Sequence, residues 1–222
     1  MKVVLLEHTP HPDEVVAAAA RLCYSASDIG TIRERLGGSR ARDLVLKLLN
    51  LGHESPLEHV SFTFGIEEVS RALSHQLVRH RIASYSQQSQ RYVKMGGFSY
   101  VLPPSIAENK EARQRFEQLM GDLQESYGDL LRVVPAEDAR YILPNACTTK
   151  LIATFNARSL YNFFTLRLCT RSQWEIRALA WEMLKLARVE APAIFSAAGP
   201  DCWGPHGCGE GEMSCRQPPE RI

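Results

Sequence analysis

The sequence has no apolar run of eighteen residues, so a membrane-spanning helix is not expected. It also lacks an excess of either charge: 26 lysines and arginines stand against 25 aspartates and glutamates, and the formal net charge is +1. Such a surface does not suit nucleic acid, and any anion site must be a local group of arginines. The opening MKVVLLEHTPHPDE becomes acidic and prolyl too soon for a signal peptide. We therefore expect a cytoplasmic protein.

Paired C-x-x-C motifs are missing too, although the chain has six cysteines. Without an export signal, reduced thiols are expected and disulfides are not. One arrangement suggests metal ligands, and it lies in the Gly- and Pro-rich C-terminal stretch: Cys202, His206, Cys208 and Cys215. Their spacing favours a flexible tail with free thiols over a structural metal site, and no other motif calls for a metal.

The patterns that are present indicate one α+β domain, residues 1–198, followed by a tail, residues 199–222. Apolar, alternating or β-branched content predicts strands over 1–7, 60–66 and 147–155. Helical spacing and capping residues predict helices over 13–25, 39–51, 69–80, 104–134, 135–143, 156–169 and 173–188. Residues 81–92 show no period and are expected to form a loop. We expect a central, mostly antiparallel sheet packed against long helices.

The most informative segment is Arg79-His80-Arg81 with the residues that follow it. Cations are common at a helix C-terminus, so the triplet alone indicates little. The next residues, IASYSQQSQR, contain no Gly, Pro, Asn or Asp, which are usual in solvated turns. They bring serines, glutamines and a further arginine instead. Such a loop offers bidentate donors for a phosphate, and donors and acceptors for a base.

This segment resembles the signature of the flavin-dependent thymidylate synthases: Arg-His-Arg, seven residues, then Ser89. Three further blocks resemble the family in its order: GHESPLEH at 52–59, DARYILP at 138–144, and FNARSLYNFFTLRL with QWEIRALA within 155–180. The resemblance implies an enzyme of de novo dTMP biosynthesis, a methyltransferase that converts dUMP to dTMP. The carbon would come from 5,10-methylenetetrahydrofolate and the electrons from NADPH through FAD. A homotetramer is also implied.

The resemblance assigns site residues by position. The FAD site would be lined by Ser55, Arg79, His80, Arg81, Gln87, Asn156, Arg158 and Asn162. The dUMP site would be formed by Gln76, Arg79, Gln87, Gln88, Ser89, Gln90, Arg91, Arg140 and Arg167. Gln87 stands at a position that is Glu in some members, and either ligand could be its partner. His53 would lie close to the flavin and help shape the access of folate or NADPH.

The chemistry of these residues agrees with the assignment. A nucleotide monophosphate needs a dianion clamp, for which Arg91 and Arg140 are the candidates. Arg167 is the expected catalytic residue, because a fixed positive charge stabilises the N3-deprotonated, enolate-like uracil. Ser89 could instead be a nucleophile, but no His–Asp pair is visibly placed to activate it. An orienting role for Ser89 is preferred, and hydride and carbon transfer then belong to the flavin.

The spacing on the helix over 156–169 bears on assembly. Arg158 and Asn162 share a face, whereas Arg167 lies roughly half a turn round, which favours active sites shared between subunits. Two other functions stay open. One is a flavin- or folate-dependent RNA uracil methylase, against which the near-neutral charge counts. The other is a non-catalytic module that uses the arginine loop only to bind nucleotide phosphate.

Overall fold

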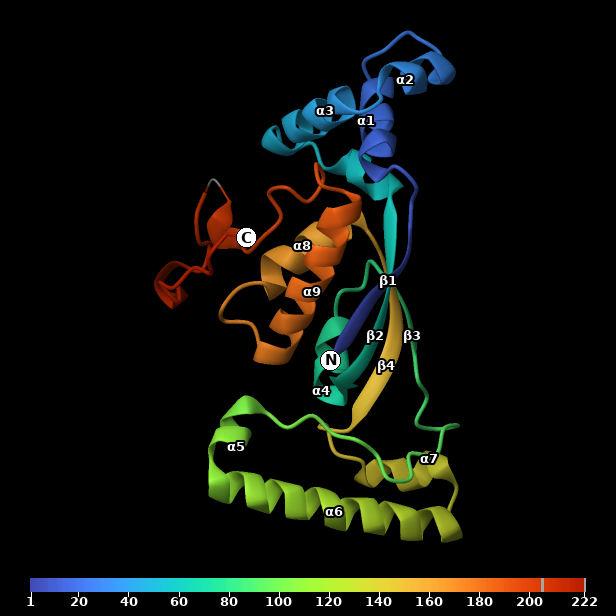
Figure 1. The fold of residues 1–222 in the computed structure, drawn as a ribbon, viewed down its shortest axis with the longest axis vertical. Coiled ribbons are helices and arrows are strands. Elements are labelled where there is room, and N and C mark those ends of the chain that lie inside the picture. Colours follow the sequence, from blue (N-terminus) through green and yellow to red (C-terminus); the bar gives the residue numbers. More distant parts are fainter. Residues whose placement is uncertain (205, 222) are drawn as a thin grey trace. The chain divides into compact units, whose positions relative to one another are not determined.

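A four-stranded sheet organises the protein, which is described here as a computed structural model covering residues 1–204 and 206–221. Its order is β1-β2-β4-β3 (Figure 1), with bounds β1 Lys2–His8, β2 Ser61–Ser70, β3 Ser84–Gln87 and β4 Thr148–Asn156. The bonds Ala157 N to Val60 O and Arg71 N to Cys147 O flank opposite ends of the β2–β4 pair, so these strands are antiparallel. The expected α+β class and antiparallel sheet are confirmed.

The buried face of the sheet follows from the alternation in β2 and β4. Phe62, Phe64 and Ile66 are fully buried, and the residues between them are partly exposed. Leu151 and Phe155 repeat the pattern on β4. Successive side chains of a strand point to opposite faces, so this period places one face of each strand in the core.

The chain forms two compact units, and every strand contributes residues to both. Unit 1 comprises residues 1–2, 66–79 and 86–152. Unit 2 comprises residues 3–65, 80–85 and 153–222. The boundary therefore falls between Arg79 and His80, inside the motif that the sequence singles out.

Unit 1 contains most of the helical residues between β2 and β4. Its elements are α4 Arg71–Leu77, α5 Pro104–Glu108, α6 Lys110–Val133, α7 Ala136–Ala139 and the 3-10 turn η2 Arg140–Ile142 (Figure 1). Phe98, Met120 and Cys147 form its small core. The single helix expected over 104–134 is wrong, because Asn109 interrupts it. The Asn109 side chain accepts from Ala112 N at 3.0 Å and caps a new helix.

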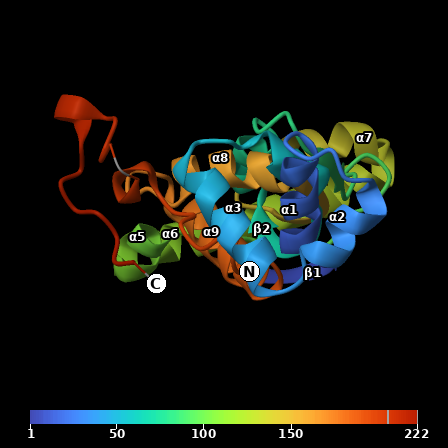
Figure 2. The same ribbon diagram turned by 90° about the horizontal axis from the view of Figure 1, so that it is seen from above.

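Unit 2 contains the N-terminal helices and the last helix pair. Its elements are α1 Pro12–Leu22, α2 Ile29–Arg35, α3 Ser39–Asn50, α8 Ala157–Arg167, α9 Trp174–Glu190 and the 3-10 turns η1 Ser55–His59, η3 Asp201–Trp203 and η4 Gly211–Met213. Helix α1 packs beside α3, as Figure 2 shows, and α8 packs beside α9. The aromatic rings of Phe163, Phe164 and Phe195 form part of the core. The Asp13 carboxylate accepts from Ala193 N and Ile194 N, both at 3.0 Å.

One local expectation needs correction, because the loop expected over 81–92 contains β3. The structure also contains α2, for which no sequence pattern was found. Helix α2 begins at a cap, since Asp28 accepts from Thr31 N at 2.9 Å. In the part of the chain that the structure describes, no helix is long and apolar enough to cross a membrane.

Candidate functional site

Gln87 is the best-anchored of the expected site residues in unit 1. It is half-buried at the end of β3, and its amide nitrogen donates to Ser74 Oγ at 3.0 Å and to Thr149 Oγ1 at 3.1 Å. Ser74 and Thr149 are buried. Both amide protons of Gln87 are thus directed to fixed acceptors, which leaves its carbonyl oxygen as the group for a ligand. A Glu at this position would have no proton to donate to these hydroxyls at neutral pH.

Two expected arginines meet at a single glutamate. Arg91 Nε lies 2.6 Å from the Glu137 carboxylate, and Arg140 Nε donates to the Glu137 backbone carbonyl at 3.0 Å. Arg71 lies near enough to Arg140 for the two charges to interact, and burial followed by this repulsion lowers the pKa of Arg71. Arg91 and Arg140 both contact Glu137, and Arg71 lies within electrostatic reach of Arg140, so positive charge is in local excess here. A group of this kind suits a phosphate dianion.

The remaining unit 1 candidates lie on α4 and the loop after β3. Ser89 Oγ accepts from Arg91 N at 3.1 Å, a turn bond that fixes the start of the loop. Gln90 lies 3.9 Å from the Cys147 sulfur, and Gln88 N donates to Lys150 O at 3.0 Å. Gln76 is half-buried on α4. The structure therefore groups Gln87 to Arg91 on one stretch, in which the Ser89 hydroxyl bonds to its own loop.

In unit 2, the central contact joins His80 and Arg167. Arg167, the last residue of α8, donates from Nε to His80 Nε2 at 3.0 Å. The imidazole stands edge-on against Phe163, with ring centroids 5.0 Å apart. Tyr85 Oη donates to the His80 carbonyl at 2.9 Å. Side chain and backbone of His80 are thus both fixed, and Arg167 is fixed through them.

The electrostatics of this contact favour a neutral imidazole. Burial, and then the charge of Arg167, lower the pKa of His80 to about 4. Burial also lowers the pKa of Arg167, which is nevertheless charged at neutral pH because a guanidinium starts from a very high value. The arginine therefore carries the positive charge of the pair.

The expected FAD residues on α8 divide between structural and exposed positions. Asn156 caps the helix, since its side chain accepts from Ser159 N at 2.8 Å, as the sequence predicts. Arg158 is exposed, with Glu54 at 3.5 Å from its Nε and Glu58 in a short contact with its Nη1. Asn162 is exposed one turn further along the same face.

The other expected residues are exposed. Ser55 begins η1, and His53 follows the end of α3, where its N–H donates to Leu48 O at 2.9 Å. Gly52, which lies between the end of α3 and His53, has φ of +70°, a left-handed conformation suited to glycine after a helix. Arg79 and Arg81 are also exposed and flank the half-buried His80. The motif therefore points one ring inward and two guanidinium groups outward.

The tail residues considered as metal ligands are Cys202, His206, Cys208 and Cys215. Among the described residues, no group of three or more His, Cys, Asp or Glu side chains is placed to hold a metal ion. All six cysteines are free.

Sequence reasoning missed the partners of the expected arginines. Glu137, Glu58 and Arg71 were not singled out. Arg158 and Glu58 are 100 residues apart, so no local pattern could have joined them. One signal was present: Glu58 lies inside the GHESPLEH block, where two glutamates flank Ser55.

Guanidinium, carboxamide and hydroxyl groups of this kind are chemically suited to a phosphate-bearing small molecule. Residues 4–193 match the family model Thy1, described as thymidylate synthase complementing protein, and the chain belongs to this family.

Curated relatives agree over nearly the full length. A protein from Geobacter sulfurreducens is 56% identical over 97% of this chain and 94% of its own length. One from Clostridium tetani is 48% identical over 97% of this chain and 93% of its own length. One from Saccharolobus solfataricus is 42% identical over 91% of this chain and 78% of its own length. Each is named flavin-dependent thymidylate synthase.

Proposed function

We propose that the protein catalyses the reaction of a flavin-dependent thymidylate synthase, the reductive methylation of dUMP to dTMP. The carbon donor is 5,10-methylenetetrahydrofolate, the reductant is NADPH, and FAD is the cofactor. The observation that carries this function is the family match over residues 4–193, which contains every assigned site residue. The comparisons support this enzyme and give no support to an RNA methylase or a non-catalytic module.

The residues assigned to FAD fit that molecule by chemical type. A flavin dinucleotide offers a diphosphate and a polar ring edge, and exposed Arg81, Arg158 and Asn162 offer guanidinium and amide donors. With Ser55, Arg79, His80, Gln87 and Asn156 they form the proposed FAD site. Bound FAD supplies the electron transfer of the reaction. The protein's part is to bind and orient, and Glu54 and Glu58 keep the Arg158 side chain in place beforehand.

The phosphate of dUMP is assigned to Arg91 and Arg140. Both are already directed toward Glu137, one to its carboxylate and one to its carbonyl. A bound phosphate would compete with the carboxylate for Arg91, so Glu137 preorganises the clamp at some cost in affinity. Gln76, Arg79, Gln87, Gln88, Ser89 and Gln90 complete the proposed set. Ser89 orients the substrate and is not a nucleophile.

The catalytic role is assigned to Arg167. Its hydrogen bond to His80 uses Nε, so the four N–H groups on the two terminal nitrogens are the part available to face uracil. A positive charge held there stabilises the electron-rich, N3-deprotonated ring before carbon transfer. His80 acts through Arg167, because its hydrogen bond holds the Arg167 guanidinium in one orientation.

The homotetramer with shared active sites is part of the proposal. In unit 1, Leu119, Val133 and Tyr141 are 51%, 77% and 83% exposed, and burial of such side chains in an interface would be favourable. On α8, Arg158 lies on an exposed face and Arg167 on a half-buried one. Light scattering of active protein tests the assembly: an active monomer would rule it out. We further propose that His53 shapes the access of folate or NADPH, and that the enzyme is cytoplasmic.

The test of the function begins with the purified protein. It should be yellow, and NADPH should bleach it. Tritium release from dUMP labelled at position 5 should then require methylenetetrahydrofolate. A colourless protein that cannot be reconstituted with FAD would remove the flavin function. Tritium release from labelled RNA but not from free dUMP would instead indicate the RNA methylase.

A further inference from the structure

Two buried hydroxyl groups of unit 1 contact Gln87 and have no role in the reaction proposed above. Ser74 lies on α4 and Thr149 on β4, and both side chains are buried. The Gln87 amide nitrogen donates to Ser74 Oγ at 3.0 Å and to Thr149 Oγ1 at 3.1 Å. A buried hydroxyl costs free energy unless it is hydrogen-bonded. The three side chains therefore form one network.

Ser74 determines the direction of the hydrogen bonds in this network. Its hydroxyl donates to the Arg71 backbone carbonyl at 3.0 Å. A serine hydroxyl has a single proton, so toward Gln87 it can only accept. The group that faces Ser74 must be a donor, and the amide nitrogen is the only donor group of the Gln87 side chain. One orientation of the carboxamide is therefore favoured over its flipped form.

The main chain anchors both ends of the network to β4. Arg71 N donates to Cys147 O at 3.0 Å, which fixes the start of α4 next to the strand. Gln88 N donates to Lys150 O at 3.0 Å, which fixes the residue after Gln87. The backbone of Gln87 and the carbonyl that orients Ser74 are thus both held in place.

The network decides what Gln87 can offer to a ligand. Both of its amide protons are directed to hydroxyl oxygens, so the carbonyl oxygen is left and can only accept. The arginines assigned to FAD and dUMP can only donate. The two reacting rings, isoalloxazine and uracil, each carry one matching group: an imide N–H between two carbonyls, which can only donate.

We propose that Ser74 and Thr149 are positioning residues that hold Gln87 as the acceptor for an imide N–H. The inference rests on the proposed function, which supplies both rings. The flavin imide is the expected partner, because uracil is proposed to lose its N3 proton beside Arg167 and then has no N–H to donate. A flipped carboxamide would place its own N–H groups against the imide proton.

The experiment compares each ring with its N3-methyl derivative, which has no imide proton. Full-length protein freed of flavin is titrated with FAD and with N3-methyl FAD. Flavin-loaded protein is titrated with dUMP and with N3-methyl dUMP. Calorimetry gives the four dissociation constants, and for each ring the constant of the methylated form is divided by that of the unmethylated form. The methyl group has the same bulk in every variant, so a change in this ratio reports the hydrogen bond.

The variants remove the acceptors without changing Gln87. Ser74→Ala combined with Thr149→Val frees the carboxamide to turn, and the FAD ratio should fall about tenfold, the effect of one hydrogen bond. Thr149→Val alone keeps the shape of the side chain and should give a smaller fall. Thr149→Ser keeps the hydroxyl and should retain the ratio of the unmodified protein.

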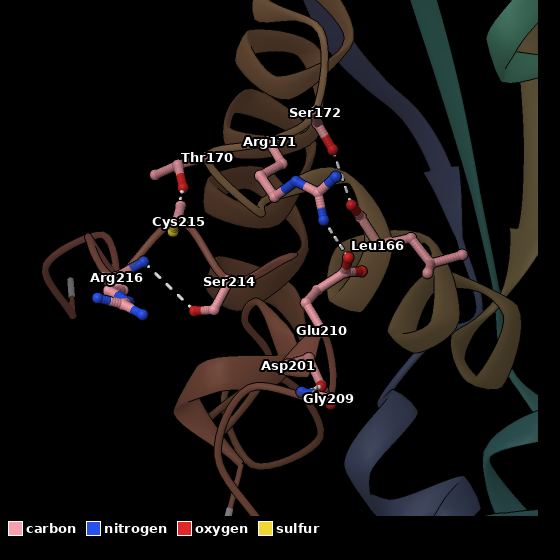
Figure 3. Close-up of polar contacts among 10 residues, drawn as sticks. All are labelled: Leu166, Thr170, Arg171, Ser172, Asp201, Gly209, Glu210, Ser214, Cys215 and Arg216. Carbon is pink, nitrogen blue, oxygen red and sulfur yellow. Dashed lines mark hydrogen bonds and ion pairs between the residues drawn. The ribbon is translucent and has the colours of Figure 1, made fainter. Parts of the chain in front are cut away.

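A serine in the C-terminal segment provides the control. The Ser214 hydroxyl accepts from Arg216 N at 3.3 Å, as Figure 3 shows, and neither residue is assigned to a ligand. Ser214→Ala therefore removes a hydroxyl acceptor of the same kind, and every ratio should stay unchanged.

The outcomes separate this inference from the proposed function. A fall in the dUMP ratio, with the FAD ratio constant, would support the acceptor role and assign it to the uracil imide. Constant ratios for both rings in the double variant and in Thr149→Val would overturn the inference, even if all affinities dropped together, because the hydroxyls would then be structural only. A protein that binds neither FAD nor dUMP would remove the proposed function and this inference with it.

Discussion

The Arg167 guanidinium donates through Nε to His80 Nε2 at 3.0 Å, so the imidazole must hold its proton on Nδ1 and be neutral. Protonation of His80 would place two positive charges face to face and remove the acceptor. The orientation of the proposed catalytic arginine therefore depends on the protonation state of the histidine in the signature motif.

The first prediction concerns acid stability. The pKa of His80 is lowered from 6.5 to about 4, so between these values the unfolded chain binds a proton that the folded chain does not. The free energy of unfolding is therefore expected to fall as pH drops from 6.5 to about 4. Below that pH, His80 should contribute no further change. In His80→Gln, whose carbonyl can still accept from Arg167, the fall should be smaller.

Urea unfolding at about pH 7 and pH 5 measures this difference, because the first value lies above the fall in stability and the second lies within it. His75→Gln, an exposed histidine of α4, is the control and should behave as the unmodified protein does. Equal pH dependence in His80→Gln and in the control would contradict the prediction.

The second prediction concerns Arg167→Ala. Removal of a preorganised charge at the uracil should reduce turnover by about 10²- to 10³-fold or abolish it, with FAD still bound. Arg167→Lys should recover little, because a lysine lacks the fork that His80 orients. Tritium release and flavin absorbance are the two readouts, and Arg115→Ala on α6 is the control. Loss of flavin in Arg167→Ala would show that the assigned role is wrong.

The third prediction concerns the phosphate clamp. Arg140→Ala and Arg91→Ala should each raise the KM for dUMP by about 10- to 100-fold, the effect of losing one charge-assisted hydrogen bond. Glu137→Gln keeps the carbonyl that accepts from Arg140 and removes the charge that competes with phosphate, so its KM should fall. Steady-state kinetics with dUMP varied give these values. An unchanged KM in both arginine variants would place the phosphate elsewhere.

The fourth prediction concerns Arg158. Arg158→Ala should weaken FAD retention, measured as the flavin left after dialysis. The thermal midpoint of the FAD-free protein should stay unchanged, because exposed ion pairs contribute little to stability. Arg132→Ala removes a comparable exposed pair with Asp129 and should leave both quantities unchanged. A large loss of stability in Arg158→Ala would assign the residue to the fold.

The sequence predicted the elements whose signal is local. The alternation through Phe62, Phe64 and Ile66 predicted β2, and Asn156 predicted the start of α8; both are confirmed. Strand β3 was missed because its inward residues are Tyr85 and Gln87, which do not read as an apolar alternation. Helix α2 was missed because it buries only Ile32.

The site was predictable in residue types but not in contacts. Two separate blocks of the sequence identified His80 and Arg167, and their hydrogen bond joins positions 87 residues apart. The same is true of Gln87 with Thr149, 62 residues apart. Such pairs depend on the tertiary fold, so sequence patterns do not report them. The domain boundary at residue 198 stays a prediction.

The bonds from Asp13 to Ala193 N and Ile194 N have a consequence for synthesis. Asp13 leaves the ribosome 180 residues before its first partner, so the helix it begins cannot reach its final contacts on a partly made chain. Contacts of such sequence separation slow folding. Unit 2 should therefore acquire protease resistance only once residue 194 has emerged from the ribosome, which nascent chains stalled at increasing lengths would reveal.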